Sequence, residues 1–259
     1  MRSPCEPGQA RGRLSGTAAQ WPGIVIRAHD LGRVLCIMGP VYREPAVPLS
    51  KYHYIVVEGP IGVGKTSLAR RLAARLRSTL VLEHPEQNPF LPRFYQDMPR
   101  FALPTQLFFL FQRIGQLREL AQMDLFNRLT VCDFLLEKDP LFARLTLSGD
   151  ELHLYQQIFD ALKPQAPRPD LVVYLQAQPA TLYERVRRRG VEFERPISAE
   201  YLALLADSYS RFFYHFNGSP VLIVNSEKLD FVNDDRDLDL LIERVGAMRG
   251  SREFFNWGE

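Results

Sequence analysis

HYIVVEGPIGVGKTSLARRLAARL, residues 53–76, joins a short apolar run to a helical pattern through a glycine-rich turn. Within it, Gly59, Gly64, Lys65 and Thr66 match the pattern G-x-x-x-x-G-K-[ST]. Glycines let such a loop curl until successive backbone N–H groups point inward at an anion, and the following helix adds the positive end of its dipole. The stretch therefore predicts a phosphate-binding loop, or P-loop, inside an α/β domain.

The residue types of this loop also predict what it binds. The Lys65 ammonium group can reach the β- and γ-phosphates of a nucleotide, and the Thr66 hydroxyl can bind Mg²⁺. We therefore expect a nucleotide and Mg²⁺ at this position. The residues expected around the phosphates are Gly59, Pro60, Ile61, Gly62, Val63, Gly64, Lys65, Thr66 and Ser67.

Apolar runs alternate with helical patterns along the rest of the chain. Continuous runs of Val, Ile and Leu are typical of strands buried on both faces of a parallel sheet. The runs lie at residues 54–58, 79–83, 129–133, 171–175 and 221–225. Helical patterns cover residues 66–77, 100–123, 148–163, 179–189, 198–216 and 236–248. This alternation predicts βαβ units and a three-layer α/β sandwich.

The composition narrows the classes of partner. A formal net charge of +2 demands no nucleic-acid partner, and the longest apolar runs are too short to span a membrane. The three cysteines are scattered without metal-ligand spacing, which suits a reducing compartment and predicts a cytoplasmic protein. We therefore expect neither a nucleic-acid nor a membrane partner.

The two ends of the chain differ from its middle. Residues 1–50 are rich in Pro, Gly and Arg without periodicity, so we expect a disordered extension or a translation start assigned too early. The folded domain is expected over residues 51–249. Residues 250–259 form a tail rich in aromatic side chains, which we expect to dock on another surface, such as that of a partner subunit.

A P-loop alone does not separate GTPases, ATPases and kinases. The stretch VNSEKLD, residues 224–230, does not fit the N-K-x-D pattern by which GTPases read guanine. Glu83, at the end of the second predicted strand, would face the ligand crevice and could accept a proton from a hydroxyl group. Gln106 interrupts an apolar helix face, where its amide could read a base edge or could be an ordinary buried glutamine with satisfied hydrogen bonds.

Four stretches together carry a family resemblance. They are GPIGVGKTS (59–67), NPFLPRFYQDMPRFALPTQLFFLFQR (88–113), CDFLLEKDPLFA (132–143) and RRRGVEFE with the later YLALL (187–205). In this order they resemble the bacterial deoxyadenosine/deoxyguanosine kinase family of deoxynucleoside kinases, from about Tyr52 to Val245. The resemblance implies a five-stranded parallel sheet, a homodimer, and Mg-ATP-dependent transfer to the 5′-hydroxyl of a deoxynucleoside.

The resemblance also implies residue roles. Glu83 corresponds to the catalytic base and Gln106 to the base-reading glutamine. Tyr95 and Glu194 correspond to the residues that bind the 3′-hydroxyl of the sugar. A surface carboxylate, a packed tyrosine and a solvated charge remain the structural alternatives for Glu83, Tyr95 and Glu194.

The stretch ERVRRRGVEFE, residues 184–194, resembles an arginine-rich lid over the phosphates. Guanidinium groups there would stabilise the charge on the transferring phosphoryl oxygens, and closure would exclude water. Arg185 and Arg189 match the family spacing best, whereas Arg187 and Arg188 could be solvated charges. The segment NSEKLDFVND, residues 225–234, resembles the part of the family that surrounds the ATP adenine or is a plain polar loop.

Two positions depart from the family pattern. Many relatives carry an acidic residue followed by Arg after the third strand, but here the pair is Asp133–Phe134. Asp133 could still lie near Mg²⁺, or simply cap a helix, and Arg113 is our candidate to replace the missing arginine in substrate binding. A later lid arginine is replaced by Val191, so turnover could be altered.

We predict an ATP-dependent deoxynucleoside kinase that favours purine deoxynucleosides. One alternative is a nucleoside monophosphate kinase, since Arg93, Arg100 and Arg113 could hold the phosphate of such an acceptor. The other is a catalytically inactive, nucleotide-binding subunit with a kinase-like fold. Lys65 and Glu83 argue against that subunit, because a non-catalytic protein needs no base.

Overall fold

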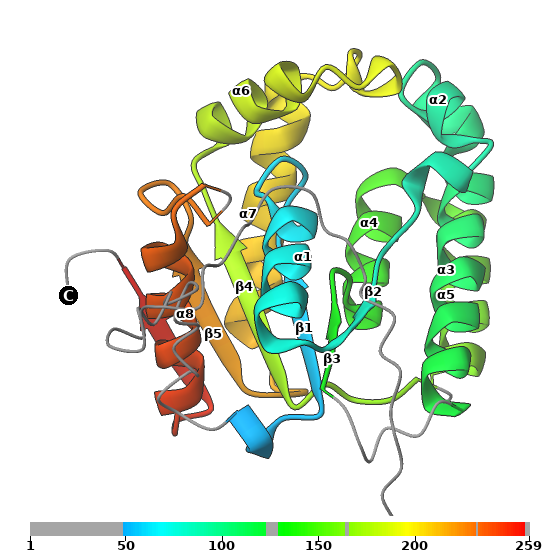
Figure 1. Ribbon diagram of the computed structural model, residues 1–259. Coiled ribbons are helices and arrows are strands. Elements are labelled where there is room, and N and C mark those ends of the chain that lie inside the picture. The colour runs from blue at the N-terminus through cyan, green and yellow to red at the C-terminus, as the bar shows by residue number, and fades with distance from the viewer. Residues whose placement is uncertain (1–48, 123–128, 164–165, 232, 257–259) are drawn as a thin grey trace, which may run out of the picture. The chain divides into compact units, whose positions relative to one another are not determined.

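The computed structural model describes residues 49–122, 129–163, 166–231 and 233–256 (Figure 1). Of the expected N-terminal extension, residues 1–50, all but the last two residues lie outside this part of the chain. The strands are β1 Tyr54–Glu58, β2 Thr79–Val81, β3 Thr130–Cys132, β4 Leu171–Gln176, β5 Val221–Asn225 and β6 Arg252–Phe255. The α-helices are α1 Lys65–Leu76, α2 Leu91–Phe94, α3 Met98–Gln122, α4 Asp139–Thr146, α5 Gly149–Leu162, α6 Pro179–Arg189, α7 Ala199–His215 and α8 Asp235–Ala247. Short 3₁₀ turns are η1 Leu49–Lys51, η2 Pro85–Gln87, η3 Leu136–Lys138 and η5 Glu192–Glu194.

In the described residues the strands form one parallel sheet with the order β2-β3-β1-β4-β5-β6. The P-loop strand β1 lies between β3 and β4, with Ile55 opposite Val131 on one side and Leu171 on the other. Because all strands run in the same direction, their carboxyl ends meet at one edge of the sheet, where ligands of such folds bind. The predicted parallel α/β architecture is therefore confirmed.

Over the described part of the chain the sheet has six strands, so the expected count of five was wrong. The sixth, β6, comes from the tail, which pairs with β5 of its own chain. The Arg252 side chain secures it by donating hydrogen bonds of 2.7 Å to the carbonyl oxygens of Tyr214 and Phe216. The sequence REFF lacks a continuous apolar run because β6 is a partly exposed edge strand, and pattern analysis therefore missed it.

Helices cover both faces of the sheet, which gives the three predicted layers (Figure 1). Ile55 and Val57 of β1 pack in the hydrophobic cluster that includes α1 and α8. Tyr54 and Val56 point to the opposite face and pack in the cluster formed with α3, α4, α5 and α7. Both sets are almost fully buried, because a central parallel strand has no solvent-facing side.

The sequence patterns placed most helices within one or two residues, but missed two short ones. α2 is only four residues long and α4 only eight, so neither gives a clear helical period. The second strand is shorter than expected and ends at Val81, which places Glu83 two residues beyond it, in the segment that leads to η2. In the described residues, no helix combines the length and apolar character needed to cross a membrane.

The packing of α8 gives a stability test with an internal control. Leu241 is fully buried in the cluster with α1, whereas its neighbour Leu240 is 46% exposed. We expect Leu241→Ala to lower the free energy of unfolding by about 2–5 kcal/mol, because it leaves a cavity in the core. Leu240→Ala should change it by no more than about 0.5 kcal/mol. Urea unfolding followed by circular dichroism measures both, and equal effects would show that α8 does not pack as described.

Candidate active site

The P-loop has the close backbone packing that its glycines allow. Gly59 and Gly62 have φ angles of 152° and 86°. A Cβ atom on Gly62 would lie 2.7 Å from the carbonyl oxygen of Leu182 in α6, and one on Gly59 would lie 2.5 Å from that of Leu175 in β4. The loop therefore fits against the ends of β4 and α6 only with glycine at these positions.

The Lys65 side chain folds back over this loop. Its ammonium group donates hydrogen bonds to the carbonyl oxygens of Gly59, at 2.8 Å, and Pro60, at 3.2 Å. Burial lowers the pKa of Lys65, against the attraction of neighbouring carboxylates. The loop thus holds the lysine at the place where phosphates would bind.

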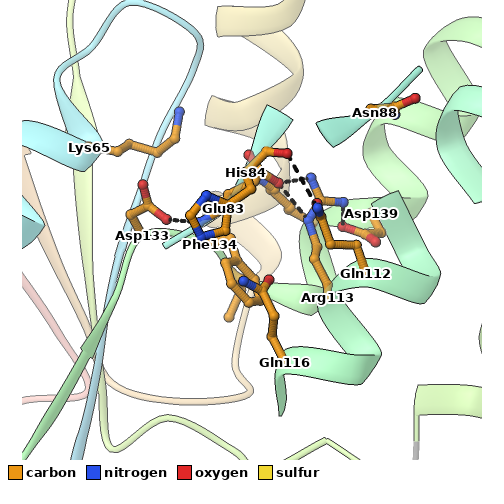
Figure 2. A network of polar contacts seen from close by, with 12 residues as sticks. Lys65, Glu83, His84, Asn88, Gln112, Arg113, Gln116, Asp133, Phe134 and Asp139 are labelled. Atoms are coloured by element: carbon orange, nitrogen blue, oxygen red, sulfur yellow. Dashed lines mark hydrogen bonds and ion pairs between the residues drawn. The ribbon is translucent and has the colours of Figure 1, made fainter. Parts of the chain in front are cut away.

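Asp133, one residue beyond β3, joins the P-loop to the segment that follows β2. One carboxylate oxygen accepts a hydrogen bond of 2.5 Å from the Thr66 hydroxyl. The other accepts a hydrogen bond of 2.7 Å from the backbone N–H of Glu83 (Figure 2). Burial raises the pKa of Asp133, and these hydrogen bonds oppose that effect. The structure therefore brings together Thr66, Glu83 and Asp133, which the sequence analysis proposed separately.

The Glu83 carboxylate is paired with Arg113 of α3. Nε of Arg113 lies 2.7 Å from the carboxylate, a second guanidinium nitrogen contacts the same oxygen, and a third lies 2.5 Å from Asp139 (Figure 2). Burial opposes ionisation of Glu83, but the positive charges of Arg113, Lys138 and Lys65 outweigh it and hold its pKa at about 2. Glu83 is thus an ionised acceptor at neutral pH.

Helix α3 also holds the backbone around Glu83. The amide of Gln116 donates to the carbonyl oxygen of Leu82 at 2.7 Å, and that of Gln112 donates to the carbonyl oxygen of His84 at 3.3 Å. Both carbonyls flank Glu83 in the chain. The carboxylate is therefore positioned through its backbone by Asp133 and α3, and through its side chain by Arg113.

Glu83 lines an acceptor cavity that contains all of the predicted substrate-binding residues. In the described residues this cavity is bounded by the P-loop, α3, α7 and the lid. Its predicted members are Ile61, Gly62, Lys65, Thr66, Glu83, Tyr95, Gln106, Arg113, Asp133, Arg189 and Glu194. A larger groove of about 960 Å³, lined by residues of α4, α5 and α7, contains none of the predicted residues.

The side chains expected to bind the sugar and the base are available for hydrogen bonding. Burial raises the pKa of Tyr95 well above its ordinary value, so its hydroxyl stays protonated and can donate. Glu194 is ion-paired with Arg189 of α6 at 2.6 Å. The Gln106 amide lies 3.4 Å from the Thr146 hydroxyl, a long contact that leaves its other hydrogen-bonding groups available.

A second groove, which we call the donor groove, lies on the other side of the P-loop. It is lined by the loop, α6 and the predicted adenine segment from Ser226 to Phe231 with Asn233. Arg185 bridges these parts, because its guanidinium donates to the carbonyl oxygens of Val63 at 3.2 Å and Ser226 at 2.8 Å. Arg188 lines this groove, whereas Arg187 extends over the Tyr183 ring. The two lid arginines named as candidates, Arg185 and Arg189, thus face the donor groove and the boundary between the two sites.

The missing arginine after Asp133 is accounted for by packing. Phe134 is fully buried and belongs to the core cluster of α3, α5 and α7, so it does not line the acceptor cavity. Arg113, proposed as a replacement, does contact Glu83.

The sequence analysis missed four other residues of this region. Asp139, Lys138 and Tyr209 line or border the acceptor cavity, and Glu58 ends β1. Lys138 and Asp139 fall inside a stretch already quoted for its resemblance, and the run of three charges from Glu137 to Asp139 was the available signal.

The oxygen atoms of Thr66 and Asp133 form a suitable site for Mg²⁺. Mg²⁺ in phosphoryl-transfer sites commonly binds through one or two carboxylates together with substrate phosphates and water. Among the described residues, no group of three or more His, Cys, Asp or Glu side chains is placed to hold a metal ion. The donor set of one hydroxyl and one carboxylate beside the P-loop fits Mg²⁺ bound with a nucleotide.

Comparison with known proteins identifies the family. Residues 55–248 match the family described as deoxynucleoside kinase. The chain belongs to the deoxynucleoside kinase family. This kinase is therefore a phosphotransferase whose acceptor is a hydroxyl group of a deoxynucleoside.

Curated relatives cover most of the kinase. It is 31% identical to the deoxyguanosine kinase of Bacillus subtilis (strain 168) over 197 residues, which span 74% of this chain and 95% of the relative. It is 30% identical to the deoxyadenosine kinase of Lactobacillus acidophilus, over 70% of this chain and 88% of the relative. A solved structure of the deoxyadenosine kinase from M. mycoides with bound dATP shares its fold, with a TM-score of 0.66, 22% identity, and coverage of 75% of this chain and 99% of that chain.

The close packing of the P-loop predicts that a methyl group added at Gly62 lowers the affinity of this kinase for ATP. Gly62→Ala would place Cβ against α6 in a left-handed conformation, and such strain costs about 1–3 kcal/mol. We expect ATP affinity, measured by calorimetry, to fall about 10-fold or more. Gly115→Ala in α3 meets open space and should leave ATP affinity unchanged while adding about 0.5–1 kcal/mol of stability. Unchanged ATP affinity in the Gly62 variant would contradict the packing.

Proposed function

We propose that this deoxynucleoside kinase transfers the γ-phosphoryl group of ATP to the 5′-hydroxyl of deoxyadenosine or deoxyguanosine, with Glu83 as the general base. The observation that supports this is the bridge through Asp133. This bridge holds the ionised Glu83 carboxylate of the acceptor cavity beside the Thr66 hydroxyl of the P-loop. An acceptor hydroxyl hydrogen-bonded to Glu83 would therefore lie close to phosphates held by the loop.

On the donor side, Lys65 and the P-loop N–H groups bind the phosphates, and Arg185 and Arg189 bind the phosphoryl oxygens when the lid closes. Thr66 and Asp133 would hold Mg²⁺, which supplies positive charge to the phosphate oxygens. Because charge spreads over the equatorial oxygens during transfer, fixed positive groups stabilise the transition state more than the ground state. The dATP bound to the M. mycoides relative supports a nucleoside triphosphate as ligand of this fold.

The low pKa of Glu83 is compatible with its role. A base with a pKa of about 2 removes a proton only weakly. In phosphoryl transfer, however, catalysis comes mainly from positioning and electrostatics, with little bond formation to the protein. Glu83 needs only to orient the hydroxyl and to accept its proton late in the phosphoryl transfer. A carboxylate that stays ionised at neutral pH can do both.

On the acceptor side, Tyr95 and Glu194 would bind the 3′-hydroxyl of the sugar, Gln106 would contact the base, and Arg113, paired with Glu83, would lie near the 5′ end. The relatives named as deoxyguanosine and deoxyadenosine kinases support a purine deoxynucleoside. The Arg189–Glu194 ion pair links lid and sugar site, so substrate binding would help to position an arginine for transfer. We propose that the enzyme acts as a homodimer in the cytoplasm.

The first experiment is transfer from Mg-ATP to each of the four deoxynucleosides and to deoxythymidylate. We expect activity with deoxyadenosine or deoxyguanosine. Glu83→Gln should lower kcat about 10²- to 10⁴-fold, because the amide cannot accept the hydroxyl proton. Glu86→Gln, the same change at an exposed carboxylate on the next turn, should retain wild-type activity.

Each alternative function has its own result in this assay. Activity with deoxythymidylate alone would assign the protein to the nucleoside monophosphate kinases. Binding of ATP without transfer to any acceptor would favour a nucleotide-binding subunit. Full activity of Glu83→Gln would remove Glu83 as the base while leaving the kinase assignment intact.

A further inference from the structure

A buried ion pair lies next to the acceptor cavity and is not explained by the roles above. Lys138, at the end of η3, is 2% exposed, and Glu58, at the end of β1, is fully buried. The ammonium nitrogen lies 3.3 Å from a Glu58 carboxylate oxygen. Burying a lysine is expensive even with a partner, so its presence at this position calls for a reason.

Glu58 is held rigidly by hydrogen-bond donors from three parts of the fold. One carboxylate oxygen accepts from the backbone N–H of Gly59, at 2.8 Å, and from the Tyr209 hydroxyl of α7, at 3.1 Å. The other accepts from the backbone N–H of Leu135, at 2.8 Å, and faces Lys138. Because these donors fix Glu58, the carboxylate forms a stationary anchor for the lysine.

Lys138 presents its charge to the acceptor cavity. It lines that cavity together with Glu83 and Arg113, and its ammonium group lies 5.6 Å from the centre of the Phe142 ring. An ammonium group has three N–H donors, and one oxygen of Glu58 takes at most one of them. Glu58 therefore anchors the ammonium group on one side, and its remaining N–H donors are available on the side of the acceptor cavity.

Arg113 alone does not balance the negative charges around Glu83. Arg113 is shared between two carboxylates, those of Glu83 and Asp139, so its single positive charge does not neutralise both. Lys138 lines the acceptor cavity together with both Glu83 and Arg113. It supplies positive charge to this buried cluster without forming a direct ion pair with the Glu83 carboxylate, among the contacts of the described residues.

We propose that Lys138 is a positioning residue of the phosphoryl transfer: Glu58 anchors its ammonium group at the wall of the acceptor cavity, where its positive charge helps to hold the Glu83 carboxylate in place for the acceptor hydroxyl. This inference rests on the proposed role of Glu83. The simpler alternative is that Lys138 only neutralises Glu58 in the core.

Two mutant cycles on the full chain separate these explanations. The first compares wild type, Glu58→Gln, Lys138→Met and the double variant, and the second combines Lys138→Met with Glu83→Gln. For each, kcat and the KM values for ATP and the deoxynucleoside are measured, with thermal unfolding to confirm a folded protein. Lys163→Met, the same change at an exposed residue outside the cavity, is the control and should match wild type.

We expect Lys138→Met to lower kcat about 10- to 100-fold, with both KM values within about threefold of wild type. The double variant Glu58→Gln/Lys138→Met should be no faster than Lys138→Met. In the Glu83→Gln background, Lys138→Met should cause no further loss, because the group through which it acts is already gone. If Lys138→Met alone does not fold, the double variant, which leaves no unpaired buried charge, is compared with Glu58→Gln and should show the same loss of kcat.

Three results would overturn the inference. A double variant restored to the rate of Glu58→Gln would show that Lys138 only neutralises Glu58. An equal loss in the wild-type and Glu83→Gln backgrounds would show that the lysine acts independently of Glu83. A wild-type kcat in Lys138→Met would exclude any role in transfer. Failure of the proposed function itself is recognised separately, by absence of transfer in wild type or by full activity of Glu83→Gln.

Discussion

The carboxylate of Asp133 holds the two halves of this active site together. It accepts hydrogen bonds from the Thr66 hydroxyl on the donor side and from the backbone N–H of Glu83 on the acceptor side. Its place follows from the strand order, because β3 lies between β1, which leads into the P-loop, and β2, which leads to Glu83. A short side chain at the end of the middle strand can therefore reach both neighbours, and it fixes the backbone of Glu83 relative to Thr66.

Around this bridge the enzyme concentrates buried charge. The buried carboxylates of Glu58, Glu83, Asp133 and Asp139 lie among the positive charges of Lys65, Lys138 and Arg113. Each ion would be costly to bury alone, and the pairs and hydrogen bonds make their burial possible. Burial raises the pKa of Asp139 to about 6 even beside Arg113 and Lys138, whereas that of Glu83 falls to about 2. Of these two carboxylates, the one with the lowered pKa thus lines the acceptor cavity.

Side chains of the lid line both the donor groove and the acceptor cavity. Arg185 contacts the P-loop and Ser226, whereas Arg189 pairs with Glu194 at the acceptor cavity. Helix α6 therefore carries an arginine to each of the two cavities.

The sequence by itself determined the features that local patterns encode. The P-loop, the parallel α/β class and five strands follow from glycine spacing and apolar runs. A strand end and an apolar helix face pointed to Glu83 and Gln106, the resemblance added Tyr95 and Glu194, and the structure places all four in one cavity. Only the tertiary structure decided the rest. The edge strand β6 lacks an apolar run and forms because β5 offers a free edge. The pairing of Arg113 with Glu83 and Asp139, and of Lys138 with Glu58, joins residues distant in the chain. Such contacts depend on which strand ends meet at the edge of the sheet, and no local period in the sequence encodes that order.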